Sequence, residues 1–288
     1  GPCAVILFSG RAPMRSADAS YTFSVDRNFY YMTGIDHANM ILVLTKDYTG
    51  KYAEALYIEP YDEVQAKWVG GRMRPAEATE LSGIVDIRYL DTFEAAVNTF
   101  IRTNRGEGEM TCWLDLWKHT SEQEPTWAHK LAHKMQHEQP AVKIEDIYGD
   151  IARMRVIKSE AELERMRIAQ VTTQHAIEAM MRYAHPDVNE CALEGAFDFS
   201  LAQQNVREHA FHSIVAGGAR ATTLHYGENN QVVHDGEMVL IDLGSAHEHY
   251  CADISRTFPV NGKFTERQKQ IYNIVLAVQD LSLIHISE

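Results

Sequence analysis

Two aspartates interrupt apolar, strand-like runs near the C-terminal end of the chain. Asp242 lies within Met238–Leu243, and Asp253 lies within Tyr250–Phe258. Two such runs joined by a short polar segment are typical of an antiparallel hairpin. If its two-residue tip is His247–Glu248, Asp242 and Asp253 become direct cross-strand partners on one face, with Cβ atoms about 5 Å apart.

Such a pair needs compensation, because like charges directly opposite destabilise a strand pair. A carboxylate in an apolar strand also costs several kcal/mol unless it is paired or hydrogen-bonded. Divalent cations remove both costs, and carboxylates bridge the two ions of a two-metal hydrolase, which lie about 3.5–4 Å apart. Asp242 and Asp253 are therefore candidate metal ligands. The alternative is structural: Asp242 accepts backbone hydrogen bonds while Asp253 pairs with Arg256, and a bulge would break the register.

A histidine-rich segment precedes the hairpin. His225 lies 17 residues before Asp242, on what the pattern predicts to be a strand entering a loop. A histidine there could hydrogen-bond a substrate carbonyl or shuttle a proton. From spacing alone, a structural histidine is the competing interpretation. We expect structural roles for three further histidines: His209, His212 and His234.

Composition limits the class of protein. The 288 residues carry 40 acidic and 27 basic side chains, a net charge of −13, which argues against nucleic acid as a partner. No apolar run reaches the length of a membrane span. Four widely spaced cysteines without a CxxC motif predict reduced thiols and a cytoplasmic protein. Strand alternation places Cys251 on the face of Asp253; we expect a small buried residue there, with a soft metal ligand or a nucleophile as the alternative.

The first half alternates strand-like and helix-like segments, which predicts an α/β domain with a mixed sheet. It contains no phosphate-binding glycine motif. Predicted helices cover Thr92–Thr103 and Ser121–His137. The predicted strands are Ala4–Phe8, Asn28–Met32, Met40–Thr45, Ala55–Ile58, Val85–Leu90, Cys112–Leu116 and Ala141–Ile147.

A second domain is predicted to begin with a long helix. Ser159 and Glu162 form a capping-box pattern ahead of an apolar stripe at helical spacing. Pro186 ends that segment, and Asn189 is placed to cap a second helix that runs to about Gln204. The predicted organisation is an N-terminal domain over residues 1–147, a linker over 148–158, a second domain over 159–280 and a non-native tail over 281–288.

Motifs in both halves resemble the aminopeptidase P and prolidase group of metallopeptidases. The likeness implies that the second domain is an incomplete α+β "pita-bread" catalytic domain, of the creatinase and aminopeptidase type. In that domain it rests on Lys158–Glu160, Leu224–Asn229, Asp235–Gly244 and Ala252–Thr265. In the first half it rests on Ser16–Asp18, Asn28–Gly34 and Trp68–Arg72.

The resemblance also implies a site. Asp242 and Asp253 match the family's two aspartate ligands for a pair of divalent ions, commonly Mn²⁺, and His225 matches a catalytic, substrate-binding histidine that is not a ligand. The family's liganding His and two Glu would follow after the last residue of this chain, and His285 is a poor substitute. The implied reaction is release of the residue before a proline at the second position of a peptide. With two of five ligands, we expect this chain itself to be inactive.

The resemblance leaves three rival functions. A prolidase would act on dipeptides, a metal-free relative would hydrolyse creatine, and a non-catalytic pita-bread module would only bind proteins. Retention of both Asp242 and Asp253 argues against the last two. The expected partner is a peptide substrate, with no nucleic acid and no membrane. Family members assemble as dimers or tetramers, so we also expect a homo-oligomer, with Trp68 a candidate interface residue.

Overall fold

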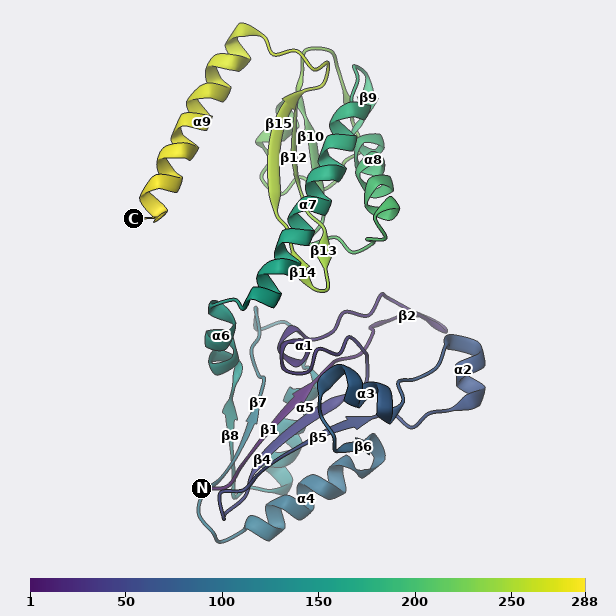
Figure 1. Cartoon of the computed structure of the whole chain (residues 1–288), viewed down its shortest axis with the longest axis vertical. Coiled ribbons are helices and arrows are strands. Elements are labelled where there is room, and N and C mark those ends of the chain that lie inside the picture. Colours follow the sequence, from purple (N-terminus) through teal and green to yellow (C-terminus); the bar gives the residue numbers. More distant parts are fainter. Residues whose placement is uncertain (288) are drawn as a thin grey trace. The chain divides into compact units, whose positions relative to one another are not determined.

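The structure is a computed structural model that describes residues 1–287, apart from the side chains of Gln65, Val69, His285 and Ser287. The chain divides into two units, Gly1–Ile157 and Lys158–Glu288 (Figure 1). The segment predicted to be a linker is largely helix α6, Tyr148–Val156, which belongs to the first unit.

The first unit is built on a six-stranded mixed sheet, as predicted. Its strand order is β6-β5-β4-β1-β7-β8. Strand β1 pairs antiparallel with β4 and parallel with β7, and β8 extends the parallel part. The strands are β1 Cys3–Phe8, β4 Ile41–Lys46, β5 Tyr52–Ile58, β6 Ile87–Tyr89, β7 Met110–Leu114 and β8 Val142–Asp146.

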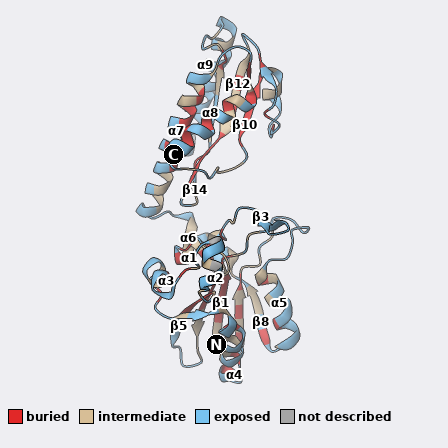
Figure 2. Cartoon of the chain, turned by 90° about the vertical axis from the view of Figure 1, so that its right-hand side faces the viewer, coloured by how far each residue is buried: buried red, intermediate tan, exposed pale blue. Residues whose placement is uncertain are grey.

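Helices cover both faces of this sheet. Alternate residues of each strand point to opposite sides, so the buried strands carry apolar side chains on both faces. Ala4 and Ile6 of β1 belong to one core, with α4 (Phe93–Asn104) and α5 (Trp127–Glu138). Leu7 belongs to the other core, with α1 (Arg27–Thr33), α3 (Pro75–Ser82) and α6. The buried strands run between these helices in Figure 2. Smaller elements complete the unit: β2 Met14–Ser16, β3 Ala19–Ser20, α2 Glu63–Val69 and the 3-10 turn η1 Leu90–Thr92.

One predicted strand is wrong: Asn28–Met32 lies in helix α1. The Asp26 side chain accepts hydrogen bonds from the backbone N–H groups of Asn28 (3.0 Å) and Phe29 (2.9 Å), and Gly34 ends the helix at φ 69°. These capping interactions outweigh the strand preference of the aromatic run. Helix α5 also begins later than predicted, at Trp127, directly after Pro125 and the N-cap Thr126.

In the second unit, two helices pack on a three-stranded antiparallel sheet. The capping box is confirmed: Ser159 N donates to Glu162 Oε2 at 2.8 Å, and α7 runs over Glu160–Tyr183. Asn189 caps α8, Glu190–Gln203, as predicted. The sheet has the order β10-β12-β15, with β10 Ile214–Gly217, β12 Met238–Leu243 and β15 Ile254–Pro259. Four short strands and a 3-10 turn connect these elements: β9 Val188–Asn189, β11 Val232–Val233, β13 Ala246–His247, β14 Tyr250–Cys251 and η2 Gly218–Thr222.

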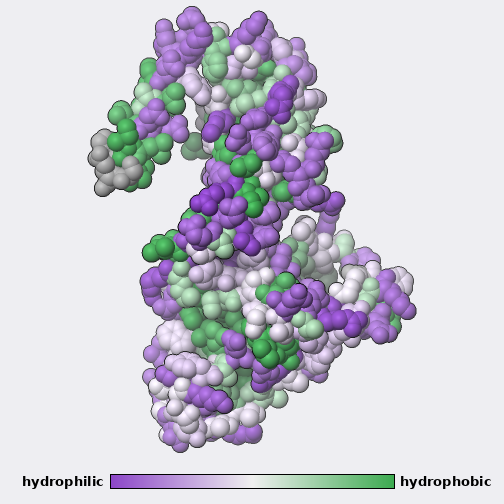
Figure 3. All heavy atoms as spheres, in the orientation of Figure 1, coloured by the Kyte–Doolittle hydropathy of each residue, from purple (hydrophilic) through white to green (hydrophobic). Residues whose placement is uncertain are grey.

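The last described element is helix α9, Glu266–Ser287, which carries large exposed apolar side chains. Ile274 is 64% exposed and Val278 is 61% exposed, and apolar residues gather on this helix in Figure 3. The predicted tail begins inside α9, and the described helix continues through it to Ser287. The His285 side chain lies outside the described residues. Within the described chain, no helix combines the length and the hydropathy that crossing a bilayer requires.

Candidate metal centre

The predicted hairpin exists, but its register is shifted. Asp242 pairs with Ser255, and the turn residues are Glu248 and His249, whose φ angles of 46° and 68° are left-handed. Both central residues of a type I′ turn need positive φ. An Asn-Gly sequence is typical of such a turn, whereas Glu-His does not predict one. The predicted tip and the direct pairing of Asp242 with Asp253 are therefore wrong.

The two aspartates nevertheless keep the same face. The cross-strand partner of Asp242 is Ser255 and not the predicted Asp253, a shift of two residues. Because side chains alternate along a strand, a shift of two residues leaves Asp253 on the same face. Asp253 becomes a diagonal neighbour, just before β15 begins at Ile254. Gly244 allows this approach, since a Cβ at that position would collide with the carbonyl oxygen of Ala252.

The carboxyl groups of Asp242 and Asp253 lie close enough to interact with each other. Loss of solvent around Asp253, the negative charge of Asp242 and a hydrogen bond between the two side chains together raise the pKa of Asp253. Ser255 Oγ donates to Asp242 Oδ1 at 2.8 Å. Arg256 donates to the Ser255 carbonyl at 2.8 Å, and no ion pair joins it to Asp253 among residues 1–287. The alternative in which Arg256 neutralises the Asp253 charge is therefore wrong for the described residues.

This donor set fits a hard divalent cation. Two carboxylates supply only oxygen ligands, which such ions prefer, and a cation between them would relieve the repulsion that raises the pKa of Asp253. Over the described part of the chain, no cluster of three or more His, Cys, Asp or Glu side chains is arranged to hold a metal. Cys251 is exposed and not buried as expected, and its thiol is not in a disulfide.

His225 lies in an exposed turn after η2 and not on a strand, contrary to prediction. Between residues 1 and 287, the structure gives its side chain no hydrogen bond or ion pair. The three histidines expected to be structural each have a partner. His209 contacts Ser213 and Asp198, His212 contacts the Gly227 carbonyl, and His234 contacts Asp187.

Glu190, at the start of α8, anchors the segment that carries His225. Its side chain is fully buried. Oε1 accepts hydrogen bonds from the Gly217 N–H and from Arg220 Nε, both at 2.8 Å. Oε2 accepts from the Tyr226 hydroxyl at 2.8 Å and from the Gln231 N–H at 2.9 Å. One carboxylate thus fixes both ends of the segment and the residue next to His225.

The charge of Glu190 is stabilised in place. Burial alone pushes its pKa upward, but hydrogen bonds from Gly217, Arg220 and Gln231 outweigh this effect and hold the pKa below 4.5. Sequence reasoning missed Glu190, because a glutamate in the first turn of a helix is ordinary there. The one available signal was a charged residue inside a segment otherwise suited to burial.

Family models match both halves of the chain. Residues 2–107 match "Aminopeptidase P, N-terminal domain", and residues 164–286 match "Metallopeptidase family M24". The chain belongs to the aminopeptidase P family. The α/β N-terminal domain and the partial pita-bread domain predicted from the sequence are thereby confirmed.

Relatives of this aminopeptidase P family member are longer than the chain. Human Xaa-Pro aminopeptidase 3 is 34% identical over 286 residues, which cover 96% of this chain and 54% of that protein. Among solved structures, a protein assigned as an aminopeptidase P from Bacillus anthracis superposes with a TM-score of 0.91 at 41% identity, covering 96% of this chain and 65% of that one. A zinc-substituted Escherichia coli aminopeptidase P in complex with product superposes with a TM-score of 0.84 at 28% identity, covering 98% of this chain and 63% of that one. The chain thus spans about half to two thirds of their length.

Proposed function

We propose that this chain forms the N-terminal part of a metal-dependent aminopeptidase that releases the first residue of peptides with proline at the second position. The observation that carries the proposal is the pair of facing carboxylates, Asp242 and Asp253, whose mutual repulsion a divalent cation would relieve. The relatives' names, Xaa-Pro aminopeptidase and aminopeptidase P, supply the substrate class.

Asp242 and Asp253 would hold the cations, commonly Mn²⁺ in this family. When bound, divalent ions polarise a carbonyl and lower the pKa of water. Ser255 orients one oxygen of Asp242, which leaves the other oxygen available to a metal. His225 is exposed and would donate a hydrogen bond to the substrate carbonyl or move a proton near it. Glu190 acts indirectly, by holding the segment on which His225 lies.

Among residues 1–287, no His or Glu joins the two aspartates in a cluster of three or more possible metal ligands, so the remaining donors of a five-ligand site, one His and two Glu, would have to come from elsewhere. We therefore propose that the 288-residue chain binds metal weakly and does not hydrolyse peptides. A protein of the relatives' full length would hydrolyse them. The proposal includes a homo-oligomeric, cytoplasmic protein without nucleic-acid or membrane partners. Trp68, which is 84% exposed on α2, is the candidate contact between subunits.

The test compares the 288-residue chain with a full-length protein in a Mn²⁺ titration, using Ala-Pro-Ala, Ala-Ala-Ala and Ala-Pro as substrates. We expect the full-length protein to release alanine from Ala-Pro-Ala only, and Asp253→Asn to abolish this. Preference for Ala-Pro would identify a dipeptidase. Robust cleavage by the 288-residue chain would refute the requirement for further ligands.

A further inference from the structure

A large cavity in the first unit lies where ligands bind in α/β sheets, beyond the carboxyl ends of parallel strands. Its volume is about 780 Å³, within the range of small-molecule sites. It is lined by Phe8 at the end of β1, by Asp115 and Trp117 directly after β7, and by Tyr148 after β8. All the residues that line it belong to Gly1–Ile157.

Aromatic side chains form two of its walls. Trp117 and Tyr148 stack on each other, with ring centroids 4.9 Å apart and planes 13° apart. Asp146 holds this pair in place, because its Oδ1 accepts the backbone N–H groups of Leu116 and Tyr148, each at 3.0 Å. Trp127 and Phe8 form a second aromatic group, with centroids 5.6 Å apart.

Two cations beside Trp127 have hydrogen-bonding capacity to spare. The Arg11 guanidinium lies 3.6 Å from the Trp127 ring centroid and uses Nε to donate to Asn39. Lys130 is three residues after Trp127 on α5 and therefore shares its face. Its ammonium group has no hydrogen bond or ion pair to any residue from 1 to 287.

The acidic groups on the α1 side of the cavity are already engaged. Asp26 caps α1, and Asp115 accepts from the buried Asn28 side chain at 2.6 Å. Arg155 in turn donates to Asn28 Oδ1 at 2.6 Å. Within this lining the available positive charge therefore lies on the α5 side, although the whole chain carries −13.

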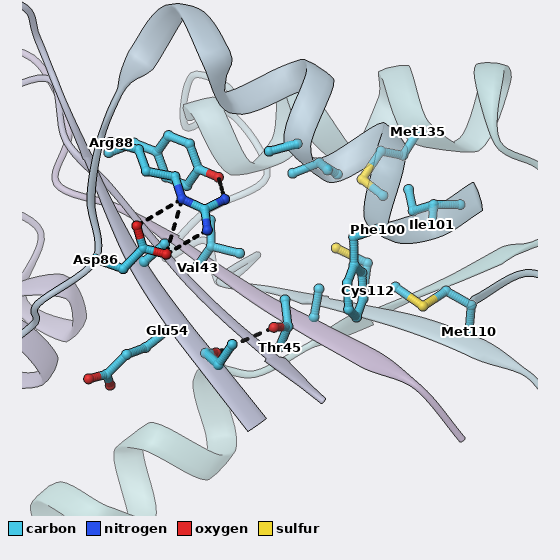
Figure 4. A pocket seen from close by; sticks show the side chains of 16 residues that line it. Val43, Thr45, Glu54, Asp86, Arg88, Phe100, Ile101, Met110, Cys112 and Met135 are labelled. Carbon is cyan, nitrogen blue, oxygen red and sulfur yellow. Dashed lines mark hydrogen bonds and ion pairs between the residues drawn. The ribbon is translucent and has the colours of Figure 1, made fainter. Parts of the chain in front are cut away.

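A second cavity in the same unit lacks this chemistry. It measures about 240 Å³ and lies between the sheet and α4, among apolar side chains such as Phe100 and Met135 (Figure 4). Its cation, Arg88, is committed to Asp86 and to the Tyr57 hydroxyl. The other charged residues of its lining, Glu54 and Asp86, are acidic, so this cavity offers an anion no uncommitted cation.

We propose that the larger cavity binds a planar aromatic anion, with the ring against Trp117 or Trp127 and the anionic group on Arg11 and Lys130. An aromatic carboxylate and a nucleoside monophosphate share this chemistry. All the residues that line the site belong to the first unit, and the inference does not rest on the proposed peptidase function.

Isothermal titration calorimetry of the 288-residue chain tests the proposal with indole-3-acetate and adenosine monophosphate as probes. Their neutral counterparts, indole-3-acetamide and adenosine, test the charge, and acetate tests the ring. We expect at least one aromatic anion to bind saturably, about tenfold tighter than its neutral counterpart, since one charge-assisted contact contributes about that factor. The probe that binds identifies the carboxylate or the phosphate as the preferred anion.

Variants locate the site. Lys130→Gln should weaken binding about tenfold, and Trp117→Leu about five- to tenfold through lost stacking. Lys134→Gln is the matched control, because Lys134 lies one turn further along α5 and pairs with Glu94 at 2.8 Å. Glu124→Gln removes an acid from the cavity wall and should strengthen binding.

Three results would overturn the proposal. The first is the absence of saturable binding for both anions up to millimolar concentrations. The second is equal binding of charged and neutral probes. The third is an equal effect of the Lys130 and Lys134 variants, with circular dichroism showing that both remain folded.

Discussion

Glu190 offers a sharp test of how the second unit holds its candidate catalytic segment. Its fully buried carboxylate accepts four hydrogen bonds, two on each oxygen. Glu190→Gln keeps the shape but turns one oxygen into a donor, so two buried donors lose their acceptor. At about 1–3 kcal/mol for each of the two orphaned groups, the second unit should lose about 2–6 kcal/mol of stability. Glu190→Ala also leaves Arg220 without its carboxylate partner. Because the Arg220 side chain is 29% exposed and stays partly solvated, this loss should cost at most the low end of the about 3–5 kcal/mol for breaking a buried ion pair.

The assay is native-state hydrogen exchange at pH 7, because a chain of two units need not unfold in one step. The amides of Gly217 and Gln231 donate directly to Glu190, so their protection should fall most. Glu178→Gln is the control, since Glu178 is an exposed helical glutamate that contacts Gln174. Equal protection of both amides in the Glu190→Gln and Glu178→Gln variants would refute the anchoring role.

The pH dependence of the same anchor has a definite sign. The pKa of Glu190 is lower in the folded chain than its ordinary value of 4.5, so its contribution to stability is present above pH 4.5. That contribution is lost as pH falls through the lower, folded-state pKa. The pKa of Tyr226 is raised by burial and by its hydrogen bond to Glu190, so its contribution is present below pH 10 and is lost in stronger base.

Two further predictions concern the hairpin. The pKa of Asp253 is raised above its ordinary value of 3.8 in the folded chain, so without metal its contribution to stability is fully present below pH 3.8 and is lost as pH rises through the folded pKa. Urea titrations from pH 3.8 upwards should show the stability of Asp253→Asn to be less sensitive to pH than that of the wild type. A wild-type profile identical to that of the variant would contradict the repulsion. Gly244→Ala places a Cβ against the Ala252 carbonyl and should cost about 1–3 kcal/mol, measured by the same titrations; an unchanged midpoint would show that the strands do not approach closely there.

Sequence patterns predicted the elements well where local signals agreed. The capping box at Ser159, the cap at Asn189 and the apolar strands of the first sheet all appear in the structure. Asn28–Met32 forms a helix and not the predicted strand, because Asp26 caps its first turn. An aromatic run suits either a strand or a buried helix, and the capping residues decide between them.

The sequence predicted that Asp242 and Asp253 share one face of the hairpin, but it did not predict the strand register. Asp242 and Asp253 share a face whether the turn is His247–Glu248 or Glu248–His249, because the two registers differ by two residues at the partner strand. The register itself depends on left-handed backbone angles that Glu248 and His249 do not signal. The sequence signals Glu190 only as a charged residue in a segment suited to burial, and it does not identify the four donors, which lie 27 to 41 positions away.

The most direct test of the central claim is Mn²⁺ binding to the 288-residue chain, followed by electron paramagnetic resonance of the free ion. Asp235→Asn is the matched control, because Asp235 is an acid that precedes β12 and contacts Asn261. We predict weak, saturable binding that is lost in Asp242→Asn and Asp253→Asn and retained in Asp235→Asn. Equal Mn²⁺ binding by all four proteins would contradict the assignment of Asp242 and Asp253 as metal ligands.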